Sequence, residues 1–141
     1  MKLWVTQCLL AEVARRYGPR RTTDLLRVEY LKMVPPDTEF LRYFSYLDLY
    51  VRFGVVGGRP ARMAVRVRRM RPDGTPWDET CRFSFVVPFT PTETYREHVF
   101  RLPNVRLTGE EKYAFQLYRR ARGWRGPYWR LLAADEFYVM R

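Results

Sequence analysis

The sequence predicts an all-β fold, an antiparallel β-sandwich of two sheets with about seven or eight strands and at most one short helix. Apolar and polar side chains alternate with a period of two along most of the chain, which is the pattern of half-buried strands. Turn-forming residues interrupt the alternation at spacings of roughly 12 to 18 residues. With 141 residues and 47% hydrophobic side chains, the chain suits a single domain, residues 1–141, with one core.

The first strand is expected at the start of the chain, where both faces are apolar. Leu3 and Val5 lie on one face and Trp4 and Cys8 on the other, as in a strand at the centre of a sheet. The following residues, 10–17, are either a short helix, ended by the glycine that follows, or an irregular excursion. The helical alternative depends on four residues that would share one helical face, namely Leu10, Val13, Ala14 and Tyr17.

Two further strands are expected before the middle of the chain. Residues 25–33 have the composition of a strand, and Pro35 and Pro36 end it because proline lacks a backbone donor. The strongest strand signal covers residues 43–53, in which large apolar side chains alternate with polar and aromatic ones. The glycines and proline of residues 54–60 predict a flexible loop.

A hairpin is predicted over residues 63–87. Apolar residues alternate with arginine up to residue 68, and residues 81–87 form the returning strand. The turn between them is Arg71-Pro72-Asp73-Gly74. Its proline presets φ, its aspartate accepts a hydrogen bond from the nearby backbone, and its glycine adopts a positive φ.

Three more strands are predicted near the end of the chain, at residues 95–102, 112–120 and 130–140. The segment between the last two, residues 119–127, contains glycine, proline and four arginines. This composition predicts a basic hairpin loop.

The order of these motifs resembles that of small bacterial immunoglobulin-like β-sandwich proteins of unknown function. The segments that carry the resemblance are Val5–Ala11, Leu25–Met33, Pro72-Asp73-Gly74, Leu107-x-Gly109 with Tyr113-x-Phe115, and Phe137-x-Val139. The resemblance implies a sandwich and supplies no catalytic residue. Three residues separate Gly109 from Tyr113, where such modules usually place one. This departure argues against a tyrosine-corner hydrogen bond from Tyr113.

The charge of the chain points to an anionic partner. Lysine and arginine number 26 against 15 acidic residues, a formal net charge of +11. Such an excess favours nucleic acid, anionic lipid headgroups or an acidic protein, and a merely soluble basic domain is the alternative. No apolar run reaches the roughly 18 residues of a membrane span, and the first residues lack a signal-peptide pattern. We therefore expect a cytoplasmic protein.

No constellation of residues for catalysis or metal binding stands out. His98 is the only histidine, and in mid-strand it is expected to be structural. Cys8 and Cys81 are expected to be small buried hydrophobes with unreactive thiols. The acidic residues are expected to be solvated or paired with nearby arginines, and no phosphate-binding glycine motif occurs. The sequence therefore predicts a protein that is not an enzyme, with no cofactor, no metal and no small-molecule substrate. An enzyme would require His98 within hydrogen-bond reach of Cys81 or a carboxylate.

Two basic clusters are the candidate contact sites. The first is expected to form a stripe on one strand and the turn after it, and consists of Arg62, Arg66, Arg68 and Arg71, with Arg69 adjoining. The second interleaves arginine with aromatic residues and consists of Arg119, Arg120, Arg122, Trp124, Arg125, Tyr128 and Arg130, with Tyr118 and Trp129 beside them. Arginine with exposed aromatic rings is typical of protein interfaces and of platforms for single-stranded nucleic acid. Alternatively, the aromatic rings belong to the core and the arginines are simply solvated.

These observations predict a non-enzymatic interaction or assembly module that binds an acidic protein or itself. The alternative function is a nucleic-acid-binding module that uses the same two clusters. Its affinity would fall steeply with salt, because neutralised phosphates release their counterions.

Overall fold

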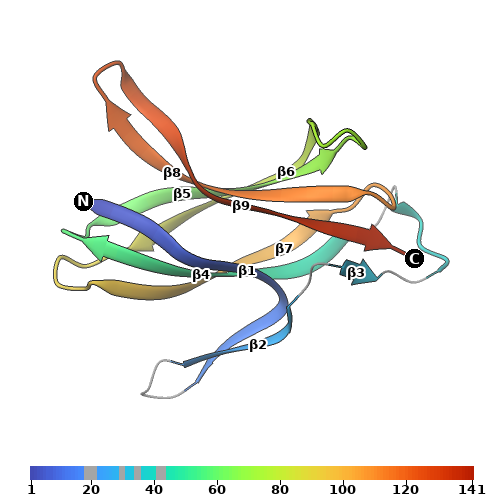
Figure 1. The fold of residues 1–141 in the computed structure, drawn as a ribbon. Helices are drawn as coiled ribbons and strands as arrows, with labels where there is room; N and C mark the ends of the chain where they lie inside the picture. Colours follow the sequence, from blue (N-terminus) through green and yellow to red (C-terminus); the bar gives the residue numbers. More distant parts are fainter. Residues whose placement is uncertain (18–21, 29–30, 34–35, 41–43) are drawn as a thin grey trace.

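The computed structural model describes residues 1–17, 22–28, 31–33, 36–40 and 44–141. Two sheets pack face to face (Figure 1), which confirms the predicted β-sandwich. The part of the chain that is described holds nine strands and no α-helix. The strands are β1 (Lys2–Tyr17), β2 (Thr22–Val28), β3 (Leu31–Met33), β4 (Phe44–Val56), β5 (Pro60–Met70), β6 (Pro76–Pro88), β7 (Tyr95–Arg106), β8 (Lys112–Gly123) and β9 (Gly126–Met140).

The strands divide into a four-stranded and a five-stranded sheet. The first has the order β2-β1-β4-β7 and the second the order β3-β9-β8-β5-β6. Every neighbouring pair is antiparallel except β3 and β9, which are parallel. The middle hairpin, β5–β6, therefore lies entirely in the second sheet, whereas β4 and β7, on either side of it in sequence, pair with each other in the first.

Residues 10–17 form neither the short helix nor the irregular excursion that the sequence predicted. They continue β1, which pairs with β4 up to Ala11 and with β2 from Ala11 to Tyr17. The strand is stable there because β2 supplies hydrogen-bond partners for its backbone. The predicted strand at residues 25–33 is in fact two strands, β2 and β3, which belong to different sheets.

The loop predicted at residues 54–60 is shorter than expected, because β4 extends to Val56. Gly54 pairs with Trp4 of β1, and the indole of Trp4 occupies the space that a side chain at position 54 would need. The glycine is therefore required by close packing within the strand. The real connection is residues 57–59, where Gly57 has a φ of +64°.

The turn between β5 and β6 confirms its predicted mechanism. Gly74 has a φ of +85°, and its N–H donates to the carbonyl of Arg71 at 2.9 Å. The Asp73 carboxylate accepts hydrogen bonds from the backbone N–H of Thr75 at 2.9 Å and from its hydroxyl at 2.6 Å. These bonds hold the pKa of Asp73 below its ordinary value.

The core lies between the two sheets and is rich in aromatic side chains. Phe53 of β4 packs edge-on against Phe89, with ring centroids 5.3 Å apart, and against Phe100 of β7 at 6.4 Å. From the opposite sheet, Tyr113 stacks on Phe137 at 5.5 Å. All five rings are buried.

The prediction that Tyr113 makes no tyrosine-corner hydrogen bond is wrong, because its hydroxyl bonds to the backbone of the preceding loop. The fully buried side chain accepts hydrogen bonds from the N–H of Thr108 at 2.9 Å and of Gly109 at 3.1 Å, and donates to the carbonyl of Gly109 at 3.1 Å. The additional residues do not move the loop out of reach, since the chain bends at residues 109–111. This bend is fixed by a hydrogen bond from the N–H of Val139 to the carbonyl of Glu111.

Candidate functional site

In the first basic cluster Arg62, Arg66 and Arg68 lie on β5 and Arg71 lies in the turn after it, and two of these arginines are bound within the protein. Arg66 and Arg68 alternate with the buried side chain of Val67. The Arg66 Nε lies 2.7 Å from the carboxylate of Glu79, and Arg68 donates to the backbone carbonyl of Trp77 at 3.3 Å. The stripe is therefore interrupted by arginines that already have partners within the protein.

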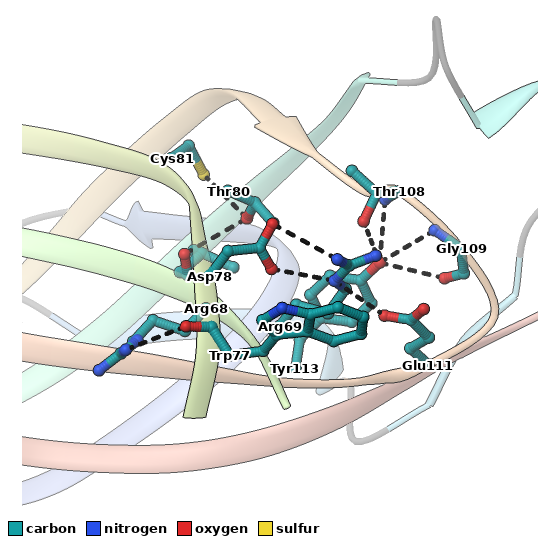
Figure 2. A network of polar contacts seen from close by, with 11 residues as sticks. Arg68, Arg69, Trp77, Asp78, Thr80, Cys81, Thr108, Gly109, Glu111 and Tyr113 are labelled. Carbon is teal, nitrogen blue, oxygen red and sulfur yellow. Dashed lines mark hydrogen bonds and ion pairs between the residues drawn. The ribbon is translucent and has the colours of Figure 1, made fainter. Parts of the chain in front are cut away.

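A network around Arg69 joins three parts of the fold at the end of this cluster (Figure 2). The Arg69 Nε lies 2.9 Å from Asp78 and 3.3 Å from Glu111. Its guanidinium stacks 3.9 Å from the ring centroid of Trp77, and that of Arg71 lies 5.7 Å from the same ring. These contacts tie the start of β6 and the bend at residues 109–111 to β5. We therefore assign this end of the cluster a structural role.

The second cluster lies on a hairpin that extends beyond the sheet. Pairing of β8 with β5 ends at Arg119, whereas pairing of β8 with β9 continues to Gly123 and Gly126. Residues 119–130, which we call the arm, therefore project from the sandwich (Figure 1). The prediction of a loop is corrected to a two-stranded hairpin, whose Gly126 has a φ of +109°.

The aromatic side chains of the arm are exposed, so the interpretation that they belong to the core is wrong. Trp124 at the tip is 90% exposed, Tyr128 is 48% exposed and Trp129 is 37% exposed. The guanidinium of Arg125 lies 4.5 Å from the ring centroid of Trp124, and that of Arg120 lies 5.3 Å from the ring centroid of Trp129. The arm thus presents aromatic rings in solvent, two of them in contact with arginine.

The arm contains no acidic residue that could neutralise its arginines. Residues 112–134 contain no aspartate or glutamate, and the arm carries five arginines, namely Arg119, Arg120, Arg122, Arg125 and Arg130. At its base is a hollow of about 390 Å³ whose charged lining residues are all arginines: Arg59, Arg62, Arg119, Arg120 and Arg122. Arg62, predicted as part of the first cluster, therefore belongs spatially to the second. Arg59, which the sequence reasoning missed, joins it because the turn after β4 lies beside β8.

Cys81 and His98, which an enzymatic role would require, lie on β6 and β7, strands of different sheets. The Cys81 thiol is approached by the Thr80 hydroxyl at 3.9 Å, and burial raises its pKa. The His98 ring packs on Phe100 with centroids 4.6 Å apart. Within the described ranges no group of three or more His, Cys, Asp or Glu side chains is arranged to hold a metal ion, and no helix is long and apolar enough to cross a bilayer.

At pH 8.5 the native Cys8 thiol is expected to react with iodoacetamide at least about a hundredfold more slowly than in the unfolded chain. Burial, with a smaller contribution from Asp135, raises its pKa from 9.0 to about 12. The folded state therefore holds this proton more tightly. The stabilisation that results is present below about pH 9 and is lost as the pH rises towards 12. Mass spectrometry of alkylated peptides, with and without urea, measures the ratio of the two alkylation rates. Equal rates in the native and the unfolded chain would contradict a raised pKa for Cys8.

No protein-family model matches the chain, and no curated protein matches it. Among solved structures, the chain is similar to an immunoglobulin-like protein from Pseudomonas aeruginosa. The two share 10% sequence identity over 99% of this chain and 98% of that chain, with a TM-score of 0.45. This likeness agrees with the resemblance to bacterial immunoglobulin-like proteins predicted from the sequence, and it concerns the fold alone.

Proposed function

We propose that this chain is a non-enzymatic interaction module that binds an acidic protein partner through the arm. The observation that carries the proposal is Trp124, which is 90% exposed at the tip of a projecting hairpin with five arginines and no acidic residue. A large ring in water gains free energy when a partner covers it. Tryptophan, tyrosine and arginine are also the residues that contribute most to protein interfaces.

An acidic partner fits this surface better than a second copy of the chain does. With a formal net charge of +11, two copies repel each other, and two arms brought together repel most strongly. An acidic surface would neutralise the arginines and accept their hydrogen bonds.

Both cysteines are free thiols, which suits the reducing cytoplasm in which we place this interaction.

Single-stranded nucleic acid is the second candidate, because exposed rings among arginines match the chemistry of base stacking and phosphate binding. The contacts of the arm favour a protein over this alternative. Arg125 and Arg120 already lie over the rings of Trp124 and Trp129, so a base would have to compete with a guanidinium for those ring faces.

The proposal is tested with two fluorescent probes, a poly-glutamate peptide and an oligo-thymidine single strand. The double variant Trp124→Ala/Arg125→Ala is expected to weaken peptide binding about tenfold, as truncation of an interface anchor does. A matched control, Arg71→Ala/Trp77→Ala, removes the same residue types from the network around Arg69. Once circular dichroism shows that this control is folded, it is expected to bind like the wild type. Fluorescence anisotropy at two salt concentrations measures both affinities.

Three outcomes would overturn the proposal. Tighter binding of oligo-thymidine than of the peptide at both salt concentrations would favour the nucleic-acid function. Equal losses in the variant and its control would show that only total charge matters. An unchanged affinity in the arm variant would remove the arm from the interaction.

A further inference from the structure

We propose that the hollow at the base of the arm is a binding site for a multiply charged oxyanion of the diphosphate class. This site is distinct from the exposed tip on which the proposed protein interaction depends. Three observations support this site: arginines line the hollow, one of them is half-buried, and several other arginines have carboxylate partners.

The hollow brings together arginines from two separate parts of the chain. Arg59 and Arg62 come from the connection after β4 and the start of β5, and the other lining arginines, Arg119, Arg120 and Arg122, come from β8. The remaining lining residues are apolar. A volume of about 390 Å³ lies within the range of small-ligand pockets.

Arg119 shows that this concentration of charge is unfavourable without a ligand. Its side chain is half-buried, and its Nε is buried without a hydrogen-bond partner among the described residues. Burial lowers the pKa of Arg119, and the like charges of Arg59 and Arg130 lower it further. The Nε atoms of Arg66 and Arg68 are also buried without a hydrogen bond, but Arg66 lies against Glu79 and Arg68 donates to the Trp77 carbonyl through another nitrogen. Among the described residues Arg119 has neither kind of contact, and such a buried donor calls for an explanation.

Several arginines elsewhere in the described residues have carboxylate partners. Arg66 is paired with Glu79, Arg69 with Asp78, and Arg96 with Glu93 at 3.1 Å. No aspartate or glutamate lines the hollow. A bound anion would supply here the counter-charge that carboxylates supply to those arginines.

The geometry of arginine indicates the class of anion. A guanidinium group is planar and binds phosphate or carboxylate oxygens with two parallel hydrogen bonds. Together the arginines that line the hollow carry more positive charge than a single carboxylate can neutralise, whereas a diphosphate group carries several negative charges in a compact volume. The apolar remainder of the lining can pack against whatever the diphosphate is attached to.

Calorimetric titration of the full chain with inorganic pyrophosphate tests this proposal. We expect saturable binding of one equivalent, weakened about tenfold or more by Arg119→Gln and by Arg59→Gln. The control Arg125→Gln removes the same charge from the tip, outside the hollow, and is expected to bind within about twofold of the wild type. Arg59 is exposed on a turn, so its variant keeps the test valid if Arg119→Gln does not fold.

Thermal unfolding supplies a second readout. Without pyrophosphate, Arg119→Gln is expected to raise the Tm, because the substitution removes like-charge repulsion. At the same pyrophosphate concentration, the Tm of the wild type is expected to rise by more than that of the variant. Absence of saturable binding, or an equal loss in Arg125→Gln, would overturn the site. Binding of poly-glutamate at the hollow with none of pyrophosphate would assign it to the protein partner instead. Because Trp124→Ala/Arg125→Ala leaves the hollow intact, the two proposals can fail separately.

Discussion

Phe53→Ala is expected to lower the free energy of unfolding by about 3–5 kcal/mol, the usual cost of truncating a buried phenylalanine. The Phe53 ring is completely buried, and it packs edge-on against both Phe89 and Phe100. Truncation removes the contacts with both rings and leaves a cavity at the centre of the sandwich. For a domain of this size the Tm is expected to fall by roughly 10–17 °C.

Urea unfolding followed by circular dichroism measures this loss. Val86→Ala serves as the control, because Val86 is 62% exposed in the neighbouring sheet, and its cost is expected to stay within about 0.5 kcal/mol. A Phe53→Ala variant as stable as this control would mean that the aromatic contacts do not form the core described here.

Tyr113→Phe is expected to cost about 2 kcal/mol, because it removes one hydroxyl and leaves several polar groups without their partner. The groups affected are the N–H of Thr108 and both the N–H and the carbonyl of Gly109. The phenylalanine ring retains the stacking on Phe137. The difference in unfolding free energy therefore isolates the hydrogen bonds from the packing.

The matched control is Tyr128→Phe, in which the hydroxyl removed belongs to a 48% exposed side chain. Its stability is expected to match that of the wild type. Amide hydrogen exchange provides a local readout, since the N–H groups of Thr108 and Gly109 are expected to exchange faster in Tyr113→Phe. Unchanged exchange at both amides would exclude the corner as a stabilising feature.

These stability variants also separate the sandwich from the arm. The tip side chain of Trp124 is 90% exposed, so its removal leaves the core contacts of Phe53 and Tyr113 intact. Conversely, a destabilised Phe53→Ala variant retains the arm sequence. Loss of partner binding in an arm variant with an unchanged Tm would therefore reflect the surface rather than the fold.

Local patterns in the sequence were sufficient to predict the fold class, the β5–β6 turn and the basic character of the arm. Periodicity in twos depends only on neighbouring residues, and within residues 43–53 it places Leu47, Leu49 and Val51 on the inward face, where all three are buried. The same alternation places Asp48 and Tyr50 on a polar outer face, and this half of the prediction is wrong, because both are buried as well. The turn at Pro72-Asp73-Gly74 was equally predictable, because its hydrogen bonds join residues only a few positions apart. The sequence also contains the excess of arginine over acidic residues in the arm.

Contacts between distant residues were decided by the tertiary structure alone. Residues 10–17 became strand because β2 paired with them, and Tyr113 reached the loop before it because the chain bends at residues 109–111. The tertiary structure also decided which arginines are paired with carboxylates. Arg66 is neutralised by Glu79 on the neighbouring strand, whereas Arg119 meets Arg59 instead of a carboxylate. A linear pattern shows which side chains carry charge, but hydrogen bonds and ion pairs act over a few ångströms, so only the fold determines which charges are compensated.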